Sequence, residues 1–417
     1  MRHTNTVVGL ILAATTLAGA ATKGAGGQWP QFHGPRRDNL STETGLLKRW
    51  PEGGPKLIWT FAECGRGFAG VAVVDGTLYT VGDFGKDEYV LALDLDGKLL
   101  WKTQNGESWR RQYPGARTTP TYDNGTLYHL NPVGRLAAFE AKTGKELWAV
   151  DFKEAFGTKY GTWAMAENIL IDGDLLLCAP GGERGRVVAL EKTTGVTLWA
   201  NTEIGDTVAY CSPILVDHGG TRQVVTILHK TIVSVEVKTG KLLWTHPHPT
   251  QHGQSVTMPI YHRGGIIASS GHGTGTRFLK LSPDGKSVEE RWLNKDLDNC
   301  HGGLILAGNR LVGAGCRLYK KGLVCVDTVT GKTRWNDAKF GPLSLAYAEG
   351  LLYAIDRKGN TSLLKAAGTG CTVVSQFTIP RKGRDLVLCH PVIFGGRLYL
   401  RHASNLFAYH IRPGAPK

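Results

Sequence analysis

One short phrase occurs five times along the chain, and it constrains the fold more than any other feature. It reads ALDLDGKLLW at 92–101 and returns, with small changes, at 138–148, 189–199, 234–244 and 325–335. Each copy combines an acidic residue, a Thr-Gly or Asp-Gly turn and a tryptophan. Recurrence at about 40 to 50 residues is typical of propellers and other repeat arrays. The sequence therefore has to be read as copies of one structural unit.

A series of aromatic residues gives the number of copies. Successive members are 42 to 51 residues apart; they are Trp59, Trp101, Trp148, Trp199, Trp244, Trp292, Trp335 and Phe377. Between them falls a second landmark, a tight turn followed by apolar residues, as in DGTLY at 75–79 and NGTLY at 124–128. Glycine supplies the positive φ that such a hairpin needs. Six clear copies and two weaker ones make eight units.

Each unit divides into four strands in the same way. In the first unit an apolar strand at 70–74 reaches the turn, a second follows at 77–82 and a third at 89–94, and the fourth carries the tryptophan. Four antiparallel strands repeated eight times predict an all-β fold, an eight-bladed β-propeller over residues 55–411. Such a ring leaves only short, protected sheet edges.

The last unit predicts how the ring closes. Residues 390–411 hold only three strands and no final tryptophan, whereas a spare strand with Trp59 lies at 55–61, before the first unit. We expect this N-terminal strand to complete the last blade and to tie the two ends of the array together. The recurring tryptophans are then packing residues between blades, each with an indole N–H that needs a partner.

The first residues predict export. Arg2, an apolar stretch at 7–18 and the Ala-Gly-Ala sequence at 18–20 form a secretory signal peptide, 1–20, with cleavage after Ala20. The mature protein is then periplasmic or secreted, with an N-terminal extension at 21–54 and a C-terminal tail at 412–417. No later segment is apolar for long enough to predict a membrane span.

Cysteine spacing and charge say less. The eight cysteines are scattered without a CxxC pair, which signals neither a zinc site nor a redox motif, although one or two disulfides are permissible in an exported chain. Cys178 and Cys325 lie in apolar strands and are expected in the core. The net charge of +14 comes from dispersed basic residues, so no nucleic-acid partner is predicted. This charge favours either a solvated surface or attraction to polyanions such as acidic glycans.

With these repeats the chain resembles the pyrroloquinoline quinone (PQQ) repeat superfamily of propellers. That superfamily includes quinoprotein alcohol dehydrogenases, the periplasmic propeller that assists outer-membrane protein assembly, and exported bacterial propellers of unknown role. The segments at 29–60, DNCHGG at 298–303 and CHPVIFGGRLYLR at 389–401 look most like the third group. The resemblance covers about 29–411 and implies the eight-bladed fold.

The same resemblance bears on cofactors. The dehydrogenases use a disulfide between adjacent cysteines and a tryptophan around the quinone, Ca²⁺ held by acidic and amide side chains, and an aspartate as general base. This chain has no Cys-Cys dipeptide and no matching acidic set. Bound PQQ with calcium is therefore an alternative rather than the main expectation. The assembly propeller is usually a lipoprotein, and no lipidation cysteine follows the apolar stretch at 7–18.

A binding site is expected where loops from all blades converge at one end of the channel. The candidate cofactor- or ligand-binding residues in these loops are Arg66, Arg117, Trp163, Tyr210, His272, His301, Arg317 and His390, with Arg357 and His402 in neighbouring loops. Arginine forks pair with carboxylates and aromatic rings stack on planes, so the set suits an anionic or carbonyl-rich planar ligand. The histidines could instead bind a metal, but their spacing is non-local and no metal site is predicted. Catalytic residues are not identifiable.

Three functions follow from this pattern. The first is a monomeric, exported binding module that takes a small molecule, a glycan or an envelope protein through its funnel. The second is a divergent PQQ-dependent quinoprotein dehydrogenase for alcohols or sugars, the only enzyme class the sequence suggests. The third is an envelope assembly scaffold.

Overall fold

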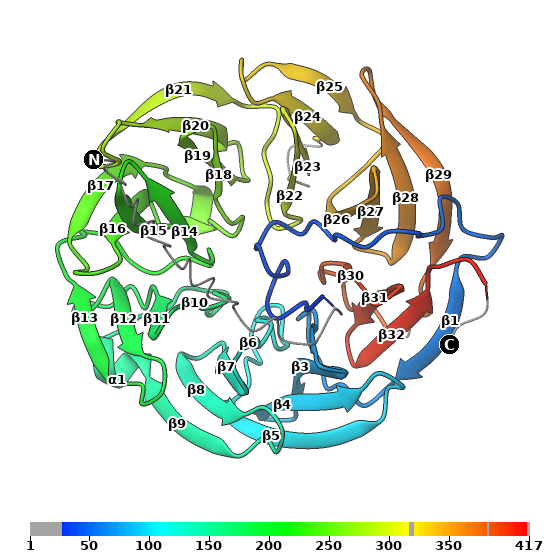
Figure 1. The fold of residues 1–417 in the computed structure, drawn as a ribbon, viewed down its shortest axis with the longest axis horizontal. Helices are drawn as coiled ribbons and strands as arrows, with labels where there is room; N and C mark the ends of the chain where they lie inside the picture. The colour runs from blue at the N-terminus through cyan, green and yellow to red at the C-terminus, as the bar shows by residue number, and fades with distance from the viewer. Residues whose placement is uncertain (1–26, 317–320, 382, 415–417) are drawn as a thin grey trace, which may run out of the picture.

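The computed structural model describes residues 27–316, 321–381 and 383–414, and within these ranges the strands form eight four-stranded antiparallel sheets arranged as a ring (Figure 1). The predicted eight-bladed β-propeller is confirmed. The predicted signal peptide, the candidate Arg317 and the end of the C-terminal tail lie outside the described residues.

The first four blades follow the chain. Blade 1 holds β2 (Ala72–Val74), β3 (Thr77–Phe84), β4 (Asp87–Asp94) and β5 (Leu99–Glu107); blade 2 holds β6 (Thr121–Asp123), β7 (Thr126–Leu130), β8 (Arg135–Glu140) and β9 (Glu146–Asp151); blade 3 holds β10 (Leu170–Asp172), β11 (Leu175–Cys178), β12 (Val187–Glu191) and β13 (Thr197–Asn201); blade 4 holds β14 (Ile214–His218), β15 (Thr221–Ile227), β16 (Thr231–Glu236) and β17 (Leu242–Pro247). A short helix, α1 (Phe152–Phe156), follows blade 2.

The other four blades repeat this order. Blade 5 holds β18 (Ile260–His262), β19 (Gly265–Ser270), β20 (Gly275–Leu281) and β21 (Val288–Asn294), after a 3₁₀ turn, η1 (Gln251–Gly253); blade 6 holds β22 (Leu304–Ala307), β23 (Arg310–Ala314), β24 (Leu323–Asp327) and β25 (Thr333–Asp337); blade 7 holds β26 (Leu343–Ala348), β27 (Leu351–Asp356), β28 (Asn360–Ala366) and β29 (Cys371–Thr378); blade 8 holds β30 (Val392–Phe394), β31 (Arg397–His402) and β32 (Asn405–His410).

The ring closes as the sequence predicts. Strand β1 (Lys56–Phe61) pairs antiparallel with β32, from Lys56 opposite His410 to Phe61 opposite Leu406. The fourth strand of the last blade therefore comes from the N-terminal side of the chain, and the two ends of the array are joined by backbone hydrogen bonds.

The recurring tryptophans lie at the seams between neighbouring blades. Trp101 of blade 1 donates its indole N–H to the carbonyl of Ala141 in blade 2 at 3.1 Å, and Trp59 donates to Leu95 of blade 1 at 2.8 Å. The glycine of the next blade's turn lies directly against the ring: a Cβ on Gly144 would stand 2.4 Å from Trp101. The Thr-Gly turn thus also seats the neighbouring blade's tryptophan, which its sequence alone did not reveal.

The core is divided along the same seams. The buried apolar residues form eight clusters in the described chain, and each cluster joins two adjacent blades. One example packs Val81 and Ala92 of blade 1 against Leu127 and Phe139 of blade 2. Burial of this kind supplies the main favourable contribution to folding, and here it holds blades to each other rather than to one centre.

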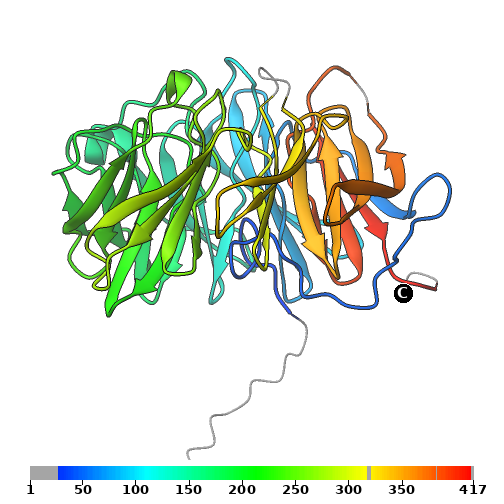
Figure 2. The same cartoon turned by 90° about the horizontal axis from the view of Figure 1, so that it is seen from above.

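The extension at 27–54 crosses one face of the ring (Figures 1 and 2). Trp29 bridges to Val73 of blade 1, and Leu40 bridges to Tyr347 of blade 7. Between them the buried Arg37 donates to the carbonyls of Asn168 and Ile169 in front of blade 3, at 3.0 Å each. Further hydrogen bonds join Pro30 to Tyr122 of blade 2 and Glu43 to Gly395 of blade 8, so the extension is tied to five blades.

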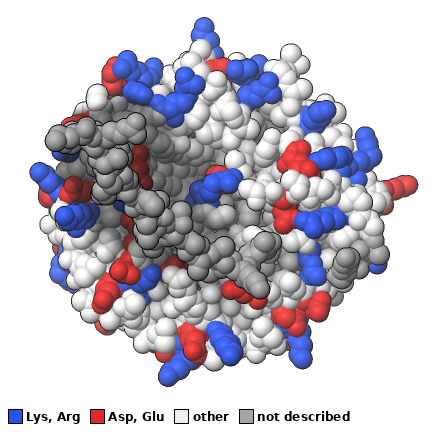
Figure 3. All heavy atoms as spheres, in the orientation of Figure 1, with Lys and Arg blue, Asp and Glu red and all other residues white. Residues whose placement is uncertain are grey.

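On the face shown in Figure 3, lysine and arginine are interleaved with aspartate and glutamate round the rim. The basic residues visible on this face are spread round it rather than gathered in one strip. No helix within the described residues has the length and apolar character needed to cross a bilayer.

Candidate functional site

A cavity of about 400 Å³ lies on the axis of the ring, because every blade contributes to its wall. Its lining residues stand before the first strand of a blade or after the second. They are Phe32, Phe68, Gly70, Tyr113, Arg117, Trp163, Ala166, Asn168, Tyr210, Ser212, Gln254, Val256, His272, Cys300, His301, Cys316, Arg357, Leu388 and His390. Phe32 belongs to the extension, so this segment forms part of the cavity wall.

Six of the eight candidates named from the sequence line this one cavity: Arg117, Trp163, Tyr210, His272, His301 and His390. The other two differ. Arg66 is not among the lining residues, and its guanidinium contacts the Asp385 carboxylate at 2.5 Å. Arg317 lies outside the described residues. Of the neighbouring candidates, Arg357 lines the cavity, while His402 is buried and contacts the carbonyl of Asp385.

Three histidines join the extension to the wall. His33 and His390 meet at 2.9 Å between Nε2 and Nδ1, and His390 Nε2 donates to the carbonyl of His301 at 2.9 Å. That donation makes His390 Nδ1 the acceptor from His33. Burial lowers the pKa of His301 to about 3 and that of His390 to about 4. Both rings are therefore neutral at physiological pH and act as fixed hydrogen-bonding groups.

Two arginines give the cavity its positive charge. Arg357 Nη2 donates to His301 Nε2 at 2.9 Å, and Arg117 Nη2 donates to the carbonyl of Tyr113 at 2.6 Å. Burial lowers the pKa of Arg117 to about 10, which still leaves it charged at neutral pH. Behind it, burial raises the pKa of both Asp83 and Glu88. A carboxyl that holds a proton neutralises Arg117 less, and Arg117 lines the cavity, so this part of the wall is positively charged.

Aromatic rings form the apolar part of the wall. Trp163 and Tyr210 stand edge to face with ring centroids 6.3 Å apart, and Phe32 and Phe68 line the same space. Burial raises the pKa of Tyr210, so its phenol keeps its proton. Rigid rings beside guanidinium groups can hold a planar ligand by stacking while its charged edge pairs with arginine.

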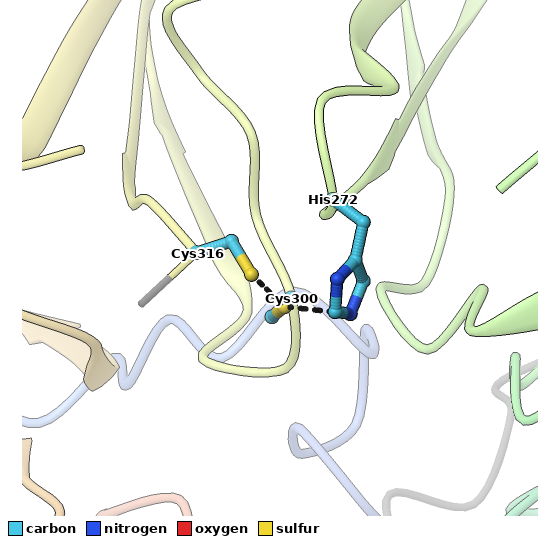
Figure 4. A group of neighbouring side chains, drawn as sticks. All are labelled: His272, Cys300 and Cys316. Carbon is cyan, nitrogen blue, oxygen red and sulfur yellow. Dashed lines mark hydrogen bonds between the residues drawn. The ribbon is translucent and has the colours of Figure 1, made fainter. Parts of the chain in front are cut away.

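The structure adds a thiol pair that the sequence did not predict. Cys300 Sγ lies 2.7 Å from Cys316 Sγ and 3.7 Å from His272 Nε2 (Figure 4). Cysteine spacing gave no signal because 16 residues and a hairpin separate the pair. The residues that follow them in the sequence did give a signal, because Cys300 precedes the candidate His301 and Cys316 precedes the candidate Arg317. No disulfide joins any of the eight cysteines, all of which lie within the described residues, and Cys178 and Cys325 are buried in strands as predicted.

Comparison with known proteins places the chain in a family. A family model described as "Outer membrane protein assembly factor BamB" matches residues 86–337, more than half of the chain. The chain belongs to this family of PQQ-like repeat β-propellers, as its repeats indicated. Among solved structures, quinohemoprotein alcohol dehydrogenase from Comamonas testosteroni has a TM-score of 0.66 at 15% identity, covering 94% of this chain and 82% of that one. BamB from Moraxella catarrhalis has 0.59 at 14% identity, covering 87% and 99%. At such identities these likenesses show the fold.

Curated relatives include quinohemoprotein alcohol dehydrogenases, outer-membrane protein assembly factors and a tetrathionate hydrolase of Acidithiobacillus ferrooxidans. Quinohemoprotein alcohol dehydrogenase ADH-IIG of Pseudomonas putida is 32% identical over 155 residues, which are 34% of this chain and 21% of the relative. BamB of Nitrosomonas eutropha is 28% identical over 170 residues, which are 41% and 34%. The chain thus spans about a third or less of the length of these relatives.

The cavity can be tested for a calcium-bound quinone. Its volume and its arginines suit a planar polycarboxylate. Calcium, however, takes six to eight oxygen ligands, largely carboxylates. The described lining residues include no aspartate or glutamate, and the oxygen donors among their side chains are Asn168, Ser212, Gln254 and two tyrosines. These residues do not fit the calcium–quinone pair of the dehydrogenases, and no catalytic step is derived through it.

Proposed function

We propose that the chain is an exported binding propeller that takes an anionic ligand, a planar polycarboxylate or an acidic sugar, in the cavity on the ring axis. The observation that carries this proposal is the lining: two arginines and several aromatic rings face one space of about 400 Å³. Ligand pockets in proteins are commonly about 300–1,000 Å³, apolar for the most part, with a few polar groups that fix orientation. The cavity has this composition.

Recognition would divide between the two kinds of side chain. Arg117 and Arg357 would pair with carboxylates of the ligand, because guanidinium forks bind them in two-point contacts. Trp163, Tyr210 and Phe68 would cover the faces of its ring. Arg357 is held by His301, whose neutral Nε2 accepts its N–H, so the fork keeps one orientation before the ligand arrives. Such preorganisation lowers the entropy lost on binding.

Export is part of the proposal. It is supported by the secretory pattern at 1–20 and by the family description, which names an outer-membrane assembly factor. A small anionic molecule or an acidic glycan of the cell envelope would be the available ligand in that compartment.

The test uses two probes and calorimetry on the full chain. PQQ without added metal represents planar tricarboxylates, and a hexuronic acid oligosaccharide represents acidic glycans. At least one should bind, and Arg117→Met or Arg357→Met should weaken its Kd about tenfold or more, equivalent to about 1.4 kcal/mol. Arg110→Met, an exposed arginine near the same loop, should leave the Kd unchanged. Absence of binding by both probes would contradict the proposal, as would robust alcohol turnover with PQQ and Ca²⁺.

The family match supports a second candidate, an envelope assembly scaffold. In this case a protein, rather than a small molecule, would occupy the loops round the cavity. The expected result is a stable complex recovered after crosslinking in the native envelope, and Arg117→Met should affect it less than it affects probe binding. Recovery of the chain alone after crosslinking would argue against the scaffold.

A further inference from the structure

Three potential metal ligands meet at the wall of the cavity, from loops of two adjacent blades. His272 follows β19 in blade 5, whereas Cys300 precedes β22 and Cys316 follows β23 in blade 6. The ligand atoms of the three side chains all lie within 4.8 Å of one another, and all three residues line the cavity (Figure 4).

The loops hold these side chains in place. His272 has a φ of 58°, a left-handed conformation that is uncommon for a residue with a side chain. Strained backbone of this kind is concentrated at functional sites, where the surrounding structure maintains it. The preceding Gly271 leaves room for sulfur: a Cβ there would lie 2.5 Å from Cys300 Sγ. The local sequence is thus fitted to the position of the thiol.

Two thiols and an imidazole form a set of ligands that favours Zn²⁺. Thiolate and imidazole are ligands that Zn²⁺ binds tetrahedrally, at about 2.3 Å to sulfur and about 2.0–2.1 Å to nitrogen. Those bond lengths place a ligand sulfur and nitrogen about 3.6 Å apart, close to the 3.7 Å between Cys300 and His272. The two sulfurs would have to separate by about 1 Å. The fully buried Asp298, whose Oδ2 accepts the N–H of Gly273 at 2.8 Å, adds negative charge beside them.

The geometry points to a site for a thiophilic divalent ion, Zn²⁺ in particular, held by His272, Cys300 and Cys316. Three protein ligands leave a fourth coordination position, and because all three residues line the cavity, a molecule bound there could reach the ion. Structural zinc sites fill four positions with protein, whereas sites that act on a ligand keep one open. The ion would therefore offer a contact for water or for an anionic group of a bound molecule. This inference uses different residues from the arginine-based proposal above and can fail independently of it.

The experiment is a Co²⁺ titration of the full chain, purified with reductant and then freed of metal by a chelator. Cobalt bound by two thiolates and an imidazole should give sulfur-to-metal charge-transfer absorption and visible tetrahedral bands at one ion per chain, and Zn²⁺ should remove both. Cys300→Ser, Cys316→Ser and His272→Gln should each weaken Co²⁺ binding at least tenfold. Cys371→Ala, which removes a cysteine from β29 far from the cavity, should not.

A count of reactive thiols tests whether Cys300 and Cys316 are available as metal ligands. Chain recovered from the exported fraction without reductant, then denatured with chelator, should show eight reactive thiols. A count of six, with a Cys300–Cys316 disulfide found by peptide mapping, would overturn the site because the thiolates would be consumed. A reduced chain that is folded by circular dichroism but gives no cobalt spectrum would also overturn it. Probe binding that depends on Arg117 would survive either result.

Discussion

The seams between blades and the cavity on the ring axis are built from opposite kinds of sequence. At the seams one arrangement recurs, a tryptophan ring against the glycine turn of the next blade, with the indole N–H on a backbone carbonyl. At the axis each blade contributes something different, such as Arg117 from blade 2, Trp163 from blade 3 and Tyr210 from blade 4. Repetition serves closure of the ring, and departure from repetition creates the surface that can recognise a ligand.

Two seams depart from the rule. The seam between blades 7 and 8 carries Phe377, which has no indole N–H, and the seam between blades 4 and 5 uses a different acceptor. Trp244 of blade 4 donates to the side-chain oxygen of Gln223 at 3.1 Å instead of to a carbonyl of blade 5. Gln223 then donates to the carbonyl of Gly285 in blade 5 at 3.2 Å. The side-chain amide of Gln223 thus bridges Trp244 and the turn of blade 5. In the other tryptophan seams the indole N–H contacts the next blade directly.

The strongest test of the comparison removes a seam tryptophan. Trp101→Ala should lower the free energy of unfolding by about 3–5 kcal/mol, because it opens a cavity between blades and deletes a hydrogen bond. The neighbouring Leu100 is 51% exposed, and Leu100→Ala should cost under about 0.5 kcal/mol. Denaturant unfolding of both variants measures the difference. Equal effects would show that the seams do not carry the stability of the ring.

A second test concerns the pH dependence of stability that a buried carboxyl near the ring axis should cause. Burial raises the pKa of Glu167, next to blade 3, to about 8, against 4.5 when unfolded. Between these values the folded chain binds the extra proton, so the contribution of Glu167 to stability falls as pH rises from about 5 to about 8. Glu167→Gln should remove that slope, a change on the order of 3 kcal/mol across the window. Thermal unfolding at a series of pH values measures it.

The exposed Glu203→Gln provides the control for this slope and should leave it unaltered. A Glu167→Gln profile that runs parallel to the wild type would mean that the carboxyl is ionised in the folded chain. In that case the nearby guanidinium of Arg37 would be its partner, and the extension would be held by charge.

The sequence predicted the repeated seams between blades better than the cavity on the ring axis. The spacing of Trp101 and its counterparts predicted the blades, and the missing strand of the last unit predicted the closure by β1. Both could be predicted because a contact that recurs in every blade requires the same residue types at the same positions of each repeat. Six cavity residues were predicted from their places at strand ends. The Cys300–Cys316 pair and the entry of Phe32 into the wall were not, because both depend on loops that occur once. Arg66 was expected at the same site but does not line the cavity, because its guanidinium contacts Asp385 through loop packing that no pattern records.

The seam of Trp244 offers a third test. Gln223→Met keeps the length of the side chain but leaves the N–H of Trp244 and the hydroxyl of Ser234, which donates to the same oxygen at 2.7 Å, without that acceptor. Buried donors without acceptors are costly, so the free energy of unfolding should fall by about 2 kcal/mol. Gln104→Met on the exposed side of β5 should change it by less than about 0.5 kcal/mol. A neutral Gln223→Met would show that the seam of Trp244 does not depend on its indole hydrogen bond.

The test with the smallest expected effect distinguishes two roles of glycine within blade 2, namely to allow a positive φ and to leave room for a tryptophan ring. Gly125 and Gly144 both have positive φ, 83° and 73°, so alanine at either position should cost about 1–2 kcal/mol in backbone strain. Gly125 has open space where a Cβ would stand, whereas at Gly144 the Cβ would lie 2.4 Å from Trp101. Gly144→Ala should therefore cost about 1–3 kcal/mol more than Gly125→Ala, because the ring has to move. In the Trp101→Ala background this excess should shrink to the part that comes from Thr103 Oγ1, which would stand 2.7 Å from the same Cβ, while the strain remains. A double-mutant cycle of unfolding free energies detects the change. An excess that is undiminished without the ring would show that Gly144 does not serve the packing of Trp101.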